Sequence, residues 1–346
     1  SEDVLQRHRH IRIDSTPGRQ NKCGASAASV CCRTVTSPND MLLGWDVGGT
    51  KSAAVIATRA GQVVVRSQWA SNAPAGPERM IEDFLRESRR LRAGRPVSSV
   101  GVSIGGPVNP LTGVVVGPPH LPMWDKIPLR DILQDRLGLP TVIEHDAAAC
   151  LLAEWLWGAA RGTTHAAYLT CGTGCGAGLI IDGRIVRGPD GRSGELGHVR
   201  IADDGPEVFG KRGGVESFCG GEGIGKLAAE RFPGRFGPET TPAVLAGRAA
   251  EGDMDARSVL VEAAERTGQV CALLADIFCP QMILLGSLGR YLGDGWVEIV
   301  RGAFKAEALP ANAEACVIAL PALGENLQDL SAVAPCVHRT RRECEG

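Results

Sequence analysis

The chain has 346 residues, of which 22% are charged and 44% are apolar, a composition typical of a folded protein with a sizeable core. Lys plus Arg number 37 against 39 for Asp plus Glu, so the formal net charge is only −2. This balance gives no broad basic surface for nucleic acid or an anionic membrane, so neither is expected as a partner. With no long apolar run and no secretory leader pattern, we expect a cytoplasmic protein.

The pattern changes abruptly at Met41. Residues 1–40 mix polar residues and glycine without a period of 2 or 3.6, which predicts a disordered extension. Apolar runs bounded by turn residues then predict strands over 41–47, 52–58, 62–66 and 97–104, with an amphipathic helix over 77–92.

The same order recurs about 123 residues later. A strand over 166–170 is followed by a glycine turn, and residues 179–181 are expected to pair with 185–186 across Asp182-Gly183, a signal for a type I′ hairpin. Gly49-Thr50 and Gly172-Thr173 occupy matching places in the two units. The repeat predicts two related α/β halves, whose turns could hold the phosphates of one nucleotide between them.

The last third of the chain predicts a long helix over 258–279 and a buried strand over 282–285. The strand ends at Gly286-Ser287, where a ligand could approach the backbone closely, although a plain connection fits equally well. Twelve cysteines occur without a C-x-x-C pair, which favours buried thiols over a metal or redox motif.

Asp46 ends the first strand and precedes the turn Gly48-Gly49-Thr50-Lys51. Glycines let backbone N–H groups approach phosphate oxygens, and an Asp at this place can hold Mg²⁺ through water. A simple hairpin turn also fits, and the string is not a P-loop. The partner turn Gly172-Thr173-Gly174 favours the phosphate-binding interpretation.

Asp146 lies between a strand over 141–143 and an alanine-rich helix over 147–160, after Glu144-His145. An Asp at this place commonly caps the helix. It also lies at the carboxyl end of a strand, where open α/β sheets bind ligands and where a carboxylate can accept a proton from an attacking hydroxyl. The two roles are compatible.

Glu195 and His198, within Gly194-Glu195-Leu196-Gly197-His198, and Glu216 further on form a polar group in a glycine-rich stretch. Such a loop suits the binding of sugar hydroxyls. Two other interpretations also fit: these residues are exposed polar side chains without a binding role, or His198 is a metal ligand.

In this order, these motifs resemble the ROK family of bacterial sugar kinases and repressors, over roughly residues 42–330. The segment 118–128, with His120-Leu121-Pro122, resembles the family's hexose-binding loop. The resemblance implies a two-domain α/β fold of the actin/hexokinase (ribonuclease H-like) type with an interdomain cleft. The expected division is an extension over 1–40, a small domain over 41–140 with the phosphate-binding turn, a larger domain over 141–330 with sugar and nucleotide sites, and a tail over 331–346.

The resemblance also implies roles. Asp146 would be the catalytic base that activates a sugar hydroxyl, usually that on carbon six, and ATP with Mg²⁺ would be the donor. The residues that would bind sugar are His145, Glu195, His198 and Glu216. The residues that would bind the nucleotide are Asp46, Gly48, Gly49, Thr50, Lys51, Gly172, Thr173, Gly174, Gly286 and Ser287, with Asp46 holding Mg²⁺ through water. A homodimer is expected, as is common in the family.

Three departures from the family pattern matter. Many members bind a structural zinc through the His and three cysteines, but the matching positions here are Glu207, Phe209 and Gly214, so no zinc site is expected. His145 and His120 replace asparagines that read sugar hydroxyls, which leaves the hexose open. The charged end of the chain after Pro335 does not match the family's closing helix.

Three functions follow from this pattern. The first is an ATP-dependent hexose kinase, with glucose as the expected substrate. The second is a sugar-sensing transcriptional regulator, for which residues 1–40 are too short and too poorly patterned to form a DNA-reading module. The third is a sugar-binding protein with a degenerate nucleotide site, against which the intact Asp46, Asp146 and both glycine turns argue.

Overall fold

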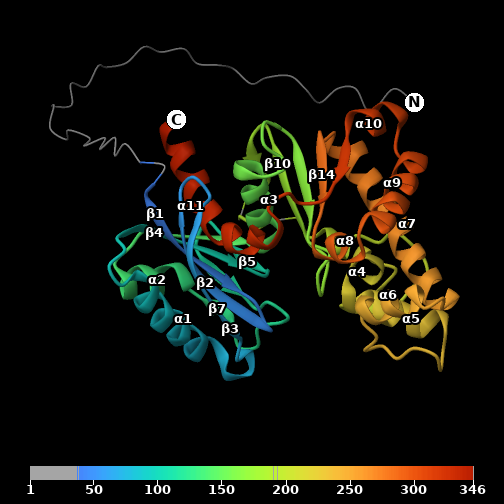
Figure 1. Cartoon of the computed structure of the whole chain (residues 1–346), viewed down its shortest axis with the longest axis horizontal. Helices are drawn as coiled ribbons and strands as arrows, with labels where there is room; N and C mark the ends of the chain where they lie inside the picture. The colour runs from blue at the N-terminus through green and yellow to red at the C-terminus, as the bar shows by residue number, and fades with distance from the viewer. Residues whose placement is uncertain (1–36, 38, 190, 193, 346) are drawn as a thin grey trace, which may run out of the picture. The chain divides into compact units, whose positions relative to one another are not determined.

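The first large sheet is built from apolar strands close to the predicted ones (Figure 1). The structure is a computed structural model that describes residues 37, 39–189, 191–192 and 194–345; the extension predicted over 1–40 lies almost wholly outside them. The strands of this sheet are β1 (Met41–Val47), β2 (Lys51–Thr58), β3 (Val63–Ala70), β4 (Val97–Ile104) and β8 (Thr141–His145). Their order is β3-β2-β1-β4-β8, with β1–β2 and β2–β3 antiparallel and β1–β4 and β4–β8 parallel.

The second large sheet repeats this topology. Its strands are β9 (Ala166–Leu169), β10 (Ala177–Ile181), β11 (Arg184–Ile185), β14 (Met282–Leu285) and β15 (Val317–Ala319), in the order β11-β10-β9-β14-β15. The strand directions match those of the first sheet. Asp182 and Gly183 form the two-residue loop of the β10–β11 hairpin, with φ values of 50° and 69°. The predicted internal repeat and type I′ hairpin are therefore confirmed.

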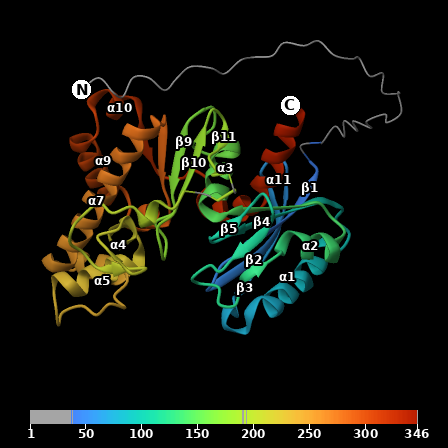
Figure 2. The same cartoon turned by 180° about the vertical axis from the view of Figure 1, so that it is seen from behind.

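Helices cover both faces of the sheets (Figure 2). They are α1 (Gly76–Arg92), α2 (Leu129–Leu137), α3 (Asp146–Trp157), α4 (Val215–Cys219), α5 (Gly221–Arg231), α6 (Pro242–Ala250), α7 (Met254–Phe278), α8 (Ser287–Leu292), α9 (Asp294–Glu307), α10 (Pro310–Ala315) and α11 (Leu327–Glu345). Short strands β5 (Val108–Asn109), β6 (Val114–Val116) and β7 (Asp125–Ile127) form a small sheet, and β12 (Glu207–Val208) and β13 (Lys211–Arg212) a hairpin. Among the described residues, no helix is long and apolar enough to cross a lipid bilayer.

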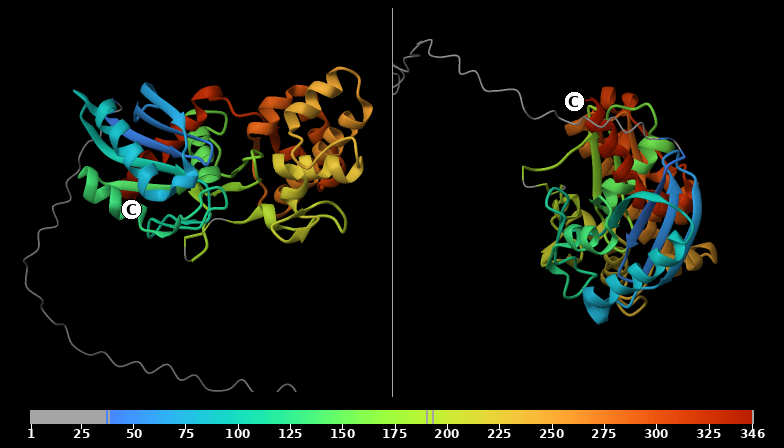
Figure 3. Two further views of the ribbon diagram at one scale, coloured as in Figure 1. Left: turned by 90° about the horizontal axis from the view of Figure 1, so that it is seen from below. Right: turned by 90° about the vertical axis from the view of Figure 1, so that its left-hand side faces the viewer.

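Within the described residues, the core consists of three apolar clusters. One packs α1 and α2 under the first sheet, and a second packs α4 to α9 against the second sheet. The third contains side chains of both sheets together with α3 and α11, which lie between them (Figure 3). Because α3 begins at Asp146, this middle layer places the predicted catalytic residue at the junction of the two sheets.

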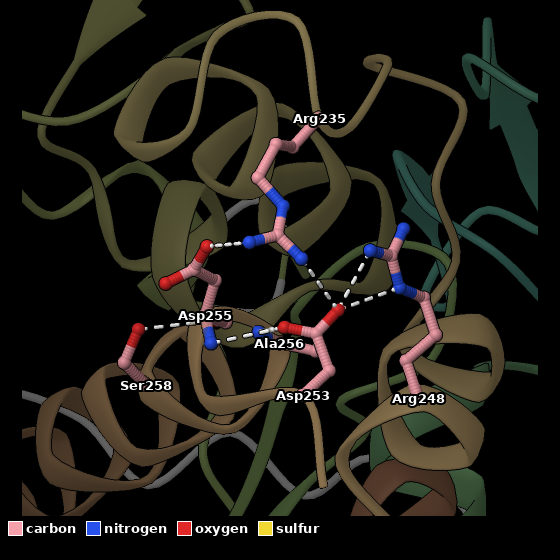
Figure 4. Close-up of polar contacts among 6 residues, drawn as sticks. All are labelled: Arg235, Arg248, Asp253, Asp255, Ala256 and Ser258. Carbon is pink, nitrogen blue, oxygen red and sulfur yellow. Dashed lines mark hydrogen bonds and ion pairs between the residues drawn. The ribbon is translucent and has the colours of Figure 1, made fainter. Parts of the chain in front are cut away.

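The long helix α7 begins four residues earlier than the predicted start because Asp253 caps it. The Asp253 Oδ1 atom accepts hydrogen bonds from the backbone N–H groups of Asp255 and Ala256 at 3.0 and 3.2 Å (Figure 4). Its Oδ2 atom forms ion pairs with the guanidinium groups of Arg235 and Arg248. The side chain thus satisfies the first free N–H groups of the helix, which the apolar period alone does not locate.

The end of the chain corrects the prediction of a tail over 331–346. Residues 331–338 belong to α11 and are buried. The helix packs directly on the central strands of the first sheet: a β-carbon on Gly101 would lie 2.1 Å from Ala332 O, and one on Gly44 would lie 2.8 Å from the Ala332 β-carbon. These two glycines let a helix approach the sheet that closely, and the burial outweighs the unfavourable Pro335 inside the helix.

The division at residue 140 is also not the division between the sheets. The strand β8 (Thr141–His145), expected in the second domain, pairs with β4 in the first sheet. The helix α11 packs on β1 and β4 as well. The second sheet begins only at β9, so α3 is the element that leads from one sheet to the other.

Glu154, in α3, holds the junction between α3 and the segment before α11. It is fully buried, and its carboxylate accepts hydrogen bonds from the N–H groups of Ala159, Ala322 and Leu323 at 2.7, 3.1 and 2.9 Å. We expect Glu154→Ala to lower the free energy of unfolding by about 3 kcal/mol or more, because three buried donors lose their acceptor. Urea unfolding followed by circular dichroism measures this. Exposed Glu251→Ala, at the C-cap of α6, is the control and should change stability by less than about 0.5 kcal/mol.

Candidate active site

The first glycine turn connects β1 to β2 and is held from one side. The Ser71 hydroxyl donates a hydrogen bond to Gly48 O at 2.6 Å, and its N–H donates to Thr50 O at 2.9 Å. Thr50 and Lys51 are exposed. The turn is therefore fixed at its base while its outer side is accessible to a ligand.

Asp46, just before this turn, lies in an acidic environment. The pKa of its carboxyl group is raised from 3.8 to about 7: burial is the largest cause, the negative charges of Asp146 and then Asp329 add to it, and Arg66 opposes them. The Arg66 Nε atom donates a hydrogen bond to Asp329 Oδ1 at 2.8 Å, which connects β3 to α11. Asp46 and Asp146 thus concentrate negative charge and hard oxygen ligands, the donor set that Mg²⁺ prefers.

Asp146 is the first residue of α3 rather than its N-cap, which is His145. The prediction of an N-cap is therefore wrong by one residue, although the Asp146 Oδ1 atom still accepts a hydrogen bond from the N–H group of Ala147 at 2.6 Å. Its side chain is 43% exposed, and a β-carbon on Gly105 would lie 3.9 Å from Oδ2. A carboxylate that is held by a hydrogen bond at one oxygen and belongs to a side chain 43% exposed suits a general base.

His145 fills the space between two glycines beside Asp146. A β-carbon on Gly106 would lie 2.6 Å from its Cδ2 atom, and one on Gly176 would lie 3.5 Å from its Cε1 atom. The ring Nε2 atom is 3.4 Å from Asp146 Oδ1, and the side chain is only 12% exposed. The ring therefore lies against the predicted base, Gly106 and Gly176, so its shape limits what can bind there.

The second glycine turn is held by the start of α5. Gly172 N donates to Gly174 O at 2.9 Å within the turn, and the N–H groups of Gly221 and Glu222 donate to Gly172 O and Thr173 O at 2.8 and 3.0 Å. Thr173 is exposed. Like the first turn, this turn is fixed by hydrogen bonds on one side while its exposed side is accessible to a ligand.

A pocket of about 550 Å³ extends from the second turn. It is lined by residues 171–173, 221–222, 238–243, 287–288 and Tyr291. The prediction that Gly172, Thr173 and Ser287 share a site is consistent with this pocket. Gly286 instead lies behind it, where a β-carbon would be 2.4 Å from Thr170 O. Sequence reasoning missed the segment 238–243 and Tyr291, which belong to no motif.

Glu216, at the start of α4, marks a third group of residues. Its Oε2 atom accepts a hydrogen bond from Cys175 N at 2.9 Å. Burial raises the pKa of its carboxyl group, and this hydrogen bond together with the charges of His120 and His198 opposes the rise. The residue before His198 lies against the same carboxylate, since a β-carbon on Gly197 would lie 3.2 Å from Glu216 Oε2.

The loops around these groups are in contact with one another. A β-carbon on Gly49 would lie 2.5 Å from His120 O, so the first turn lies against the segment 118–128. The backbone N–H of Cys175 donates a hydrogen bond to Glu216, and the next residue, Gly176, lies against His145.

Glu195 lies one 3₁₀ turn before His198, and its side chain is exposed. The N–H group of His198 donates a hydrogen bond to Glu195 O at 3.1 Å. The structure therefore brings the predicted residues of three separate motifs to one region.

The three positions that would hold zinc cysteines lie in and beside the β12–β13 hairpin. Glu207 begins β12, Phe209 is in the loop, and Gly214 precedes α4. Glycine and phenylalanine supply no metal ligand, so these residues do not fit a zinc ion. Across the described part of the chain, no group of three or more His, Cys, Asp or Glu side chains is arranged to hold a metal.

The chain is similar to proteins of known family and known structure. The family model of the ROK family matches residues 42–331. The chain belongs to the ROK family. The crystal structure of the ROK hexokinase from Thermus thermophilus has a TM-score of 0.76 and 29% identity, covering 88% of this chain and all of its own. Together with the two sheets of matching topology, this confirms the actin/hexokinase-like fold.

Relatives within the ROK family include both enzymes and regulators. A glucokinase of Streptomyces coelicolor is 28% identical over 281 residues, which cover 77% of this chain and 87% of its own. A xylose repressor of Caldicellulosiruptor bescii is 29% identical over 277 residues, which cover 75% of this chain and 69% of its own. Membership alone thus does not separate a sugar kinase from a sugar-responsive repressor.

Proposed function

We propose that this ROK protein is an ATP-dependent hexose kinase that phosphorylates glucose at the 6-hydroxyl. The observation that carries the proposal is the partly exposed carboxylate of Asp146, which lies at the start of α3 at the junction of the two sheets and whose negative charge acts on Asp46. A sugar sensor needs neither an exposed base at this place nor a second carboxylate within reach of its charge. The similarity to a glucokinase and to a ROK hexokinase supports the same activity.

In this mechanism, Asp146 accepts the proton of the attacking sugar hydroxyl as the phosphoryl group is transferred. Its Oδ1 atom is held by Ala147 N, which leaves Oδ2 to face the substrate. Asp46 would hold Mg²⁺ through water, and the ion, when bound, neutralises phosphate charge. Backbone N–H groups of the two glycine turns, at Gly48–Lys51 and Gly172–Gly174, orient the phosphates.

The sugar would lie among the polar side chains of the third group. Glu216 and Glu195 accept hydrogen bonds from hydroxyls, and His198 donates or accepts one according to its tautomer. His145 and His120 bring imidazoles where a carboxamide is usual in the family, so we expect them to govern which hexose is accepted. The 550 Å³ pocket beside Thr173 and Ser287 would take the adenosine.

The test is a coupled ADP-release assay with Mg-ATP on glucose, mannose, fructose, N-acetylglucosamine and N-acetylmannosamine. Turnover with glucose at a rate above that of the other sugars supports the proposal. Turnover with a different hexose keeps the kinase and corrects the substrate. No ADP release with any of the five, while calorimetry still detects sugar binding, contradicts the kinase and favours a sensor.

A sugar-responsive repressor is the second candidate, because the xylose repressor is as similar to this chain as the kinases are. Binding of the full chain to genomic DNA fragments by mobility shift, released by sugar and weakened by salt, would support it. The near-neutral charge balance of the chain argues against strong non-specific binding.

A further inference from the structure

The β12–β13 hairpin is fastened to the segment that carries His198. Val215 N donates to Val199 O at 2.8 Å and Ile201 N donates to Gly213 O at 2.9 Å, and a β-bridge joins Arg200 to Gly214. Residues 213–215, which directly follow the hairpin, therefore fix the backbone on the C-terminal side of His198.

Two side chains of β13 add to this attachment. The Lys211 ammonium donates a hydrogen bond to His198 O at 2.5 Å, and Arg212 forms an ion pair with Glu230 of α5. One contact holds the backbone of His198 and the other holds the hairpin to a neighbouring helix. Neither contact fixes the orientation of the imidazole ring itself.

Phe209, at the tip of the hairpin, supplies that contact. Its ring centroid lies 5.5 Å from that of His198, with 31° between the ring planes. The residue has a φ of +50°, a left-handed conformation that a bulky side chain adopts at a cost. It is also 50% exposed, so burial explains little of its presence. Two-residue hairpin loops with positive φ favour Asn or Gly at this place.

We propose that Phe209 is a positioning residue for His198, and that the β12–β13 hairpin holds this sugar-binding imidazole without a metal ion. The inference rests on the proposed function, because it assigns a role in sugar binding to His198. The ring of Phe209 limits the orientations that the imidazole can take beside Glu216, whose Oε2 atom would lie 3.2 Å from a β-carbon on the adjacent Gly197. Without the ring, the imidazole samples orientations that do not meet a sugar hydroxyl.

The experiment compares Phe209→Gly and Phe209→Asn with wild type. Both substitutes accept a positive φ, so the melting temperature should be no lower than that of wild type. The KM for the sugar should rise about 3- to 10-fold, the effect expected of losing one aromatic contact, with kcat little changed. Phe209→Tyr keeps the ring and should restore the wild-type KM.

Asp182→Gly is the matched control. Asp182 occupies the same kind of left-handed position, φ +50°, in the two-residue loop of the β10–β11 hairpin, and its side chain is 83% exposed. It should change the melting temperature in the same direction as Phe209→Gly and leave the KM unchanged. If the rise in KM came only from a more flexible hairpin loop, the KM would rise in both variants.

A double-mutant cycle with His198→Ala tests whether Phe209 acts through His198. The expected result is that Phe209→Gly has no further effect on sugar KM once His198 is alanine. Independent effects of the two substitutions would overturn the positioning role, as would an unchanged KM in Phe209→Gly.

The absence of a metal ion is tested by calorimetry. Sugar binding measured without nucleotide should be the same with and without EDTA, and a loss of binding in EDTA would overturn the metal-free assignment. If wild type binds and phosphorylates no sugar, it is the proposed function that fails.

Discussion

Asp146→Asn is expected to fold normally and to lose nearly all sugar phosphorylation, with kcat falling by about 10²- to 10⁴-fold. Asn has the size of Asp and can still accept the hydrogen bond from Ala147 N through its carbonyl oxygen, so the start of α3 is preserved. It cannot take the proton of an attacking hydroxyl. The loss should therefore appear in kcat measured by ADP release, while the sugar dissociation constant measured by calorimetry changes little.

Asp182→Asn is the control for this result, since Asp182 is an exposed residue of the β10–β11 loop and Asn tolerates its left-handed conformation. It should retain wild-type kcat. Near-wild-type turnover in Asp146→Asn would refute the assignment of the base. An equal loss in both variants would point to a fault of folding rather than of chemistry.

The two sheets were predictable from the sequence because their signals are local. Apolar runs bounded by glycine turns locate β1, β2, β4 and β14 to within a residue, and the repeated Gly-Thr turn reveals that the two halves share a topology. Asp182-Gly183 identifies a hairpin by its turn chemistry alone. Features that depend on the nearest few residues are therefore recovered well.

The end of the chain shows where local reasoning fails. Pro335 is unfavourable inside a helix by about 3 kcal/mol, and the charged residues after it suggest a solvated tail. The structure continues α11 through Pro335 because residues 331–338 are buried. That outcome depends on Gly44 and Gly101, which are more than two hundred residues away in the sequence and leave room for the helix.

The candidate site likewise has parts that local sequence predicts and parts that only tertiary packing determines. Its charged and glycine-rich parts, such as Asp46 and Asp146, lie in recognisable motifs. The wall of the large pocket formed by residues 238–243 and Tyr291 has no motif, and only tertiary packing brings it to the second turn. The ion pair of Arg66 with Asp329, which lies close to Asp46, likewise joins two elements distant in sequence.

Asp46→Asn is expected to abolish most phosphoryl transfer and, at the same time, to stabilise the protein without ligands at pH 8. Burial and the charge of Asp146 raise the pKa of Asp46 from 3.8 to about 7, so the folded state binds this proton more tightly than the unfolded state does. Stability contributed by the protonated carboxyl is therefore present at low pH and is lost as the pH rises from about 4 through about 7. Asn carries no charge and avoids this loss.

Thermal unfolding without Mg²⁺ at pH 5 and pH 8 tests this second prediction. The variant should exceed wild type at pH 8 by about 2 to 4 kcal/mol, with a smaller difference at pH 5. Added Mg²⁺ should raise the melting temperature of wild type more than that of the variant, because the ion offsets the charge of Asp46. A variant less stable than wild type at pH 8 would contradict a destabilising effect of the ionised Asp46 carboxylate. If the variant is more stable at pH 8 and its activity falls at least about 100-fold, then the protein keeps this carboxylate at a cost to stability because metal-assisted phosphate binding requires it.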